Sequence, residues 1–141
     1  MIWDVNWWAV ALATLSTLVV GSAWYTPMLF GNYWMRVARV DAGDRSPVGP
    51  ITTTILVSVV SAWVLAVAVN TAWTALGGSY LLVALGTAAL LWAGFTAARF
   101  VTHDAFEGRP AGLTAVNVAH EFITFAFMAL IVGAWPPAGT V

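Results

Sequence analysis

The chain contains no cysteine and no lysine, and it carries few charges of either sign. Without cysteine there can be no disulfide, no thiolate metal ligand and no cysteine nucleophile. Only 8% of the 141 residues are charged, whereas a soluble domain typically has about 25%. The net charge of -1, with no basic patch interleaved with aromatic residues, argues against a nucleic-acid partner. So few charges cannot cover a soluble surface, and the sequence therefore predicts an integral membrane protein in contact with the lipid bilayer.

Long apolar runs take the place of the missing charges, and 61% of the residues are hydrophobic. One membrane crossing needs about 20 residues, so the charge-free stretch between Arg45 and Arg99 is long enough for two crossings, divided at the glycine pair in "TALGGSY". The polar stretch 103–111 is predicted to be a loop. The sequence thus predicts an all-α fold, an antiparallel four-helix transmembrane bundle forming one domain, with spans over 5–26, 50–74, 80–102 and 112–135.

The arginines predict how this bundle is oriented. With four crossings, all of them fall in or beside the loops on one side of the membrane, and none lies on the side that holds both termini. Positively charged loops are retained in the cytoplasm. The N-terminus lacks the positive region of a cleaved signal peptide, so the first span should be retained. We therefore expect a multi-pass protein of the bacterial plasma (inner) membrane with both termini extracytoplasmic. The arginines are Arg36, Arg39, Arg45, Arg99 and Arg109.

The segment after the first span is more than a linker. In "MLFGNYWMRVARV" large apolar residues stand beside Arg36 and Arg39. This composition predicts a short helix lying in the membrane interface, with its arginines toward lipid phosphates. A disordered cytoplasmic loop is the alternative.

The opening of the chain resembles a known family. "NWWAVALATLSTLVVGSAWYTPMLFGNYWMR" is similar to the first part of the small bacterial membrane family named domain of unknown function 1761. The shared element has the form Trp-Tyr-x-Pro-x-x-Phe-Gly-x-x-Trp, and the resemblance extends over nearly the whole chain. It implies a four-helix membrane fold. It implies no activity and no catalytic or binding residues. The matching residues are Trp24, Tyr25, Pro27, Phe30, Gly31 and Trp34.

Polar residues gather in the last apolar segment, "VNVAHEFITFAF". At 100° per residue Asn117, Glu121 and Thr124 share one face of a helix, and His120 flanks them. Lipid cannot satisfy such a stripe, so it should face the bundle interior or a water-filled cavity. Trp92, Thr96, Arg99 and His103 form a second polar stripe on the preceding span. Because these spans are antiparallel neighbours, we expect Arg99 to pair with Glu121.

This polar site has two interpretations. In one, Arg99, Glu121 and their neighbours move or sense a small solute or ion, since an ionisable group inside a membrane is a functional candidate. In the other, the chain is a structural or accessory subunit whose polar residues only hold the helices together. No motif for an enzyme nucleophile or a phosphate loop is present. We expect no cofactor. The weak candidates for a metal or haem site are His103, Glu107, His120 and Glu121.

The second span has two unusual faces. Thr54, Ser58 and Ser61 form a small-residue stripe that lets helices approach closely. Trp63 and Asn70 lie on another face, and both need hydrogen-bond partners inside a membrane. If the small face packs within one subunit, the Trp63–Asn70 face is a candidate contact for a homo-oligomer.

Overall fold

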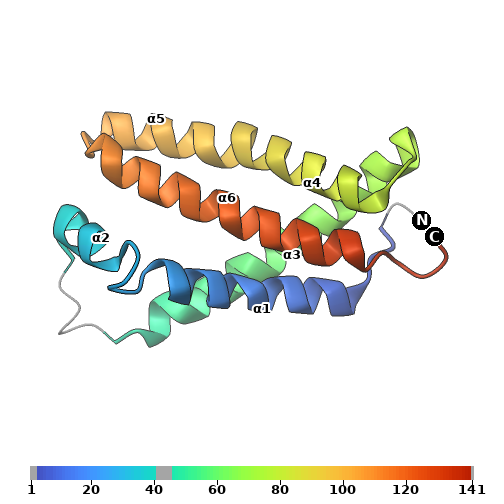
Figure 1. Ribbon diagram of the computed structural model, residues 1–141, viewed down its shortest axis with the longest axis horizontal. Helices are drawn as coiled ribbons and strands as arrows, with labels where there is room; N and C mark the ends of the chain where they lie inside the picture. Colours follow the sequence, from blue (N-terminus) through green and yellow to red (C-terminus); the bar gives the residue numbers. More distant parts are fainter. Residues whose placement is uncertain (1–2, 41–45, 141) are drawn as a thin grey trace.

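The computed structural model describes residues 3–40 and 46–140, and these two ranges contain helices and no strand (Figure 1). Arg45 lies outside the described residues. Four helical stretches are long and apolar enough to cross a membrane. The predicted all-α class with four spans is therefore confirmed. The stretches are α1 (Trp7–Trp24), α3 (Val48–Leu76), Tyr80–Phe106 and α6 (Ala111–Ala134).

The third span is not a single regular helix. It consists of α4 (Tyr80–Leu91), a π-helical segment η1 (Trp92–Ala97) and α5 (Ala98–Phe106), which continue one another. A π-helix closes its hydrogen bonds over five residues instead of four, and such segments are frequent at functional sites. The span also extends to Phe106, so four residues of the predicted loop 103–111 are helical.

The short helix predicted after the first span is present as α2 (Gly31–Ala38). It ends at Arg39, whose backbone is left-handed with a φ of 54°. It also packs on the beginning of α6, because a Cβ added to Gly112 would overlap the Tyr33 hydroxyl. Gly112 thus provides the space in which α2 is held against the bundle.

Two polar residues start helices at the end where the chain termini lie (Figure 1). Asn6 accepts hydrogen bonds through Oδ1 from the backbone N–H groups of Trp8 and Ala9, at 3.0 and 3.2 Å. Its Nδ2 donates to the carbonyl of Trp135 at 3.3 Å, which ties the start of α1 to the end of α6. Ser79 accepts from the backbone N–H of Leu82 and caps α4. These side chains satisfy donors that a helix leaves unpaired at its first turn.

The hydrophobic core occupies the half of the bundle near the termini. It combines the first half of α1, the second half of α3, the start of α4 and the end of α6, around the fully buried Leu65, Val69 and Met128. Gly133 lets α6 approach α4 closely, since a Cβ there would lie 2.8 Å from Leu81 Cδ1 and 2.9 Å from Ala84 Cβ. The other half of the bundle holds fewer buried residues, and the candidate site lies in this less densely packed half.

The direction of α3 explains the difference. It runs obliquely behind the other helices, from the α1 side at its beginning toward α4 at its end (Figure 1). Ile51, Leu56 and Val57 in its first half are exposed although they are apolar. The beginning of α3 thus stands away from α6, and a hollow is left between α1, α3 and α6.

Candidate functional site

A groove of about 430 Å³ lies between the second half of α1, the first half of α3 and the middle of α6. It is in the half of the bundle opposite the chain termini. Its volume falls within the roughly 300–1,000 Å³ typical of small-molecule sites. Its lining combines apolar side chains with ionisable and hydroxyl groups. The polar lining includes Thr17, Ser22, Thr54, Ser58, His120 and Glu121.

A hydroxyl pair joins two walls of the groove. Thr17 on α1 and Ser58 on α3 are both buried, and their side-chain oxygens lie 2.9 Å apart. Thr17 also donates to the carbonyl of Thr14 at 2.8 Å. The small side chains let α1 and α3 approach each other at this point. All three residues of the predicted small-residue stripe, Thr54, Ser58 and Ser61, line the groove, with Ser58 buried and Thr54 exposed.

His120 and Glu121 form the charged part of the groove. His120 Nδ1 lies 3.4 Å from Glu121 Oε1, and the two side chains are 15% and 31% exposed. Within residues 3–40 and 46–140 no arginine lies within 4.0 Å of the Glu121 carboxylate. Glu121 is thus a half-buried acid whose nearest basic group is the adjacent imidazole.

The aromatic element that follows α1 covers His120. The rings of Tyr25 and Trp24 have centroids 5.1 and 6.1 Å from the imidazole centroid. Tyr25 Oη donates to Asn117 Oδ1 at 3.3 Å, and its ring packs edge-on against Trp34 at 5.3 Å. The Trp-Tyr-x-Pro-x-x-Phe-Gly-x-x-Trp element therefore folds over one end of the groove and holds the histidine in place.

Three buried polar atoms have no hydrogen-bond partner among the described residues: Trp24 Nε1, His120 Nε2 and Thr124 Oγ1. Thr124 and His120 both line the groove, and Thr124 is only 7% exposed. A buried polar group without a partner costs about 1–3 kcal/mol. Two of these three atoms belong to residues that line the groove, so unpaired polarity is concentrated in its wall.

The expected ion pair between Arg99 and Glu121 is not formed. Arg99, Thr96 and His103 line a separate hollow on the outside of η1 and α5, and Glu121 lines the groove between α1, α3 and α6. Trp92, expected on the same stripe, instead turns to α6 and donates from Nε1 to the carbonyl of Val118 at 3.1 Å. The physical reason is η1. An inserted residue turns the following side chains by about 100° relative to a regular helix.

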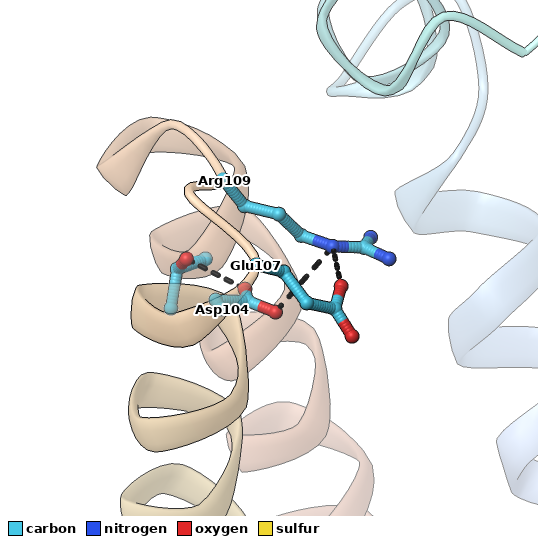
Figure 2. Close-up of polar contacts among 4 residues, drawn as sticks. Asp104, Glu107 and Arg109 are labelled. Atoms are coloured by element: carbon cyan, nitrogen blue, oxygen red, sulfur yellow. Dashed lines mark hydrogen bonds and ion pairs between the residues drawn. The ribbon is translucent and has the colours of Figure 1, made fainter.

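A second polar cluster lies at the connection between α5 and α6 (Figure 2). Arg109 donates to Glu107 and lies 3.8 Å from Asp104. The hydrogen bond with Glu107, and then its charge, raise the pKa of Arg109 above its ordinary value. Asp104 is buried and accepts a 2.6 Å hydrogen bond from Thr114 Oγ1. Asp104 thus holds α5 to α6, within the stretch predicted to be a loop.

The weak metal candidates are divided between the two hollows. His103 and Glu107 line the outer one, and His120 and Glu121 line the groove. No group of three or more histidine, aspartate or glutamate side chains close enough to hold a metal ion occurs in the part of the chain that the structure describes.

Of the Trp63–Asn70 face, predicted as a candidate oligomer contact, Asn70 lies in the interior of the chain. Asn70 is buried and donates from Nδ2 to the backbone carbonyl of Asp4 at 3.0 Å. Trp63 is half-buried and packs against the hydrophobic core. Near its end α3 contacts α4 as well as α1, so it buries a wider arc there than at its beginning.

Sequence reasoning did not place Tyr25, Thr17 or Ser22 in the site, although the structure does. Tyr25 belongs to the aromatic element already noted, but its position in that element does not indicate which residues it contacts. Thr17 is one of several small residues on α1, a pattern that favours close helix packing. Neither pattern shows which helix lies opposite.

Four apolar helices and a groove with ionisable lining define the class: a multi-pass helical protein with membrane-span-like helices and a polar site within the bundle. The chain belongs to the family described as protein of unknown function (DUF1761), whose model matches residues 8–133. The resemblance seen in the sequence is therefore confirmed over nearly the whole chain. No curated protein and no solved structure matches it.

Proposed function

We propose that this protein binds a small solute or ion within the membrane, in the groove between α1, α3 and α6, as a transporter, channel or sensor. We propose further that it lies in the bacterial inner membrane with both termini outside. The arginines would then face the cytoplasm, and the groove, which lies in the same half of the bundle as the arginine-bearing loops, would open toward that side.

The proposal rests on two features of the groove together: its open volume, and polar side chains that have no hydrogen-bond or ion-pair partner on another described helix. The groove has about 430 Å³ and includes a carboxylate with no arginine beside it. Thr124 Oγ1 and His120 Nε2 have no partner in the described chain. An ionisable group at membrane depth is costly, and it is found where it meets a partner, a cavity or a pathway.

A purely structural role for the polar residues fits other places in the same molecule. Asp104 with Thr114, and Asn70 with the backbone of Asp4, are buried polar residues whose hydrogen bonds join elements of the fold. These contacts are of the kind expected when polarity only fixes packing. Glu121 differs, because no hydrogen bond or ion pair in the described chain connects its side chain to another helix. The contrast favours a binding role for the groove.

Water access to the groove is the direct test, and a chain without cysteine makes it clean. Ser61→Cys places a thiol in the groove, whereas Val60→Cys places one on the exposed face of α3 only one residue away. Water-soluble thiosulfonate reagents react with a thiolate, which forms in water and not in lipid. With the protein in inverted membrane vesicles, we expect Ser61→Cys to be modified at least tenfold faster than Val60→Cys. Equal, slow modification of the two would contradict the proposal.

A further inference from the structure

We propose that the ligand of the groove is a protonated organic amine with an apolar portion, whose ammonium group meets the Glu121 carboxylate. The inference rests on the proposed function, and it adds the chemical class of the solute.

The charge of the lining selects the sign of the ligand. Among the residues that the structure describes, Glu121 is the one acidic residue that lines the groove, and none of the four described arginines lines it. In the form of the pair that combines a neutral imidazole with an ionised carboxylate, a proton on His120 Nδ1 faces Glu121 Oε1 at 3.4 Å. The pair then carries one negative charge. A half-buried negative charge attracts a monovalent cation and repels an anion, and the low surrounding dielectric strengthens both effects.

A hydroxyl group on the groove wall reinforces this choice. Thr54 Oγ1 donates to the carbonyl of Pro50 at 2.9 Å. A hydroxyl has one proton and two lone pairs. Because this proton is engaged by the helix backbone, the exposed Thr54 oxygen presents an acceptor to a ligand. An additional acceptor in a groove with a carboxylate suits a group with several N–H donors.

The size and the apolar walls argue for an organic cation instead of a bare metal ion. A dehydrated ion would fill a small part of about 430 Å³. A divalent cation such as Ca²⁺ needs six to eight oxygen ligands, and the groove offers one carboxylate. Its lining also has an apolar part, which includes Leu18, Val57, Phe125 and Met128. A ligand that places an ammonium group at Glu121 and a hydrocarbon part against these side chains uses both kinds of surface.

The test compares three probes of one shape in nanodiscs containing the full-length protein. Phenethylamine is a cation at neutral pH, 2-phenylethanol is neutral and phenylacetate is an anion. Binding is measured by isothermal titration calorimetry. We expect the amine to bind at least tenfold more tightly than the alcohol, and the anion to bind more weakly than either. Equal binding of the amine and the alcohol would overturn the inference.

Variants locate the effect. Glu121→Gln keeps the shape of the side chain and removes its charge, so the amine should lose at least tenfold in affinity while the alcohol changes less than threefold. Glu107→Gln is the matched control, because Glu107 is a carboxylate outside the groove, and amine binding should be unchanged. Thr54→Val, on the exposed beginning of α3, should weaken amine binding severalfold and serves if Glu121→Gln does not fold. An unchanged amine affinity in Glu121→Gln and Thr54→Val would refute the assignment.

The failure of this inference can be told apart from the failure of the proposed function. If Ser61→Cys is readily modified and the alcohol or phenylacetate protects it as well as the amine does, the groove binds solutes of another class. If Ser61→Cys is readily modified and no probe binds, the amine assignment is wrong and the groove remains a wetted site. If Ser61→Cys is as unreactive as Val60→Cys, both proposals fail.

Discussion

Gly31 offers a sharp test of how the aromatic element after α1 is folded. The chain turns tightly between α1 and α2, with backbone hydrogen bonds from Gly31 N–H to the carbonyl of Thr26 at 2.9 Å and from Phe30 N–H to that of Trp24 at 3.1 Å. A Cβ on Gly31 would lie 2.8 Å from the carbonyl carbon and the oxygen of Thr26, and closer still to the carbonyl oxygen of Tyr25. These are backbone atoms, which cannot rotate away as a side chain can.

The magnitude follows from the displacement required. Ordinary contacts between carbon atoms lie at about 3.5–4.0 Å, so the backbone of this turn must move by about 1 Å to admit a methyl group. Overpacking of this kind costs about 1–3 kcal/mol, and losing one backbone hydrogen bond adds about 1 kcal/mol. Gly31→Ala should therefore lower the free energy of unfolding by about 2–4 kcal/mol, and it should loosen the covering of His120.

Two other glycines provide a graded comparison. A Cβ at Gly49 would have no atom within 4 Å, so Gly49→Ala should be neutral or stabilising by up to about 1 kcal/mol through helix propensity. At Gly112 the obstacle is the end of the flexible Tyr33 side chain, so Gly112→Ala should fall between the two. Unfolding in detergent, followed by tryptophan fluorescence, measures all three. A Gly31→Ala variant as stable as Gly49→Ala would refute the description of this turn.

Two further predictions concern topology and η1. Cysteines introduced at Ser46 and Thr140 should react with impermeant reagents from opposite sides of the membrane. The cysteine at position 46 should be labelled only after the cytoplasmic face is exposed. Labelling of both from one side would contradict the four-span topology. Trp92→Phe removes the hydrogen bond to the carbonyl of Val118. It should lower the free energy of unfolding by about 0.5–1.5 kcal/mol, measured by the same fluorescence assay. A decrease of more than about 3 kcal/mol would show that this bond is not the main contribution of Trp92 to stability.

The sequence predicted the number of spans correctly. Bilayer thickness sets how long an apolar segment must be, and charged residues mark the loops between such segments, so composition is enough to recognise them. The glycine pair before Ser79 was enough to separate the second and third spans, and the arginines beside large apolar residues were enough to predict α2. The polar stripe of α6 was predicted from regular helical spacing, and the structure has α6 as an unbroken α-helix from Ala111 to Ala134.

The errors arose where one helix departed from regular geometry or where the partner helix had to be known. The expected Arg99–Glu121 pair assumed 100° per residue through a segment that is π-helical, and nothing in "WAGFTA" distinguishes it from an ordinary apolar helix. Asn70 was assigned to an outer face because the sequence does not show that α3 crosses obliquely and meets α4 near its end. Crossing angles depend on packing among all four helices, so a helical wheel for one of them cannot predict them.

The central claim is that Glu121 faces an open groove that takes a cation. An experimental structure of the protein in a lipid nanodisc, determined with and without phenethylamine, tests it most directly. The account predicts that α3 stands away from α6 in both, and that in the complex the amine nitrogen lies within hydrogen-bond distance of the Glu121 carboxylate. A groove closed by α3 packing onto α6, or one filled by a lipid chain with Glu121 paired to an arginine, would contradict it.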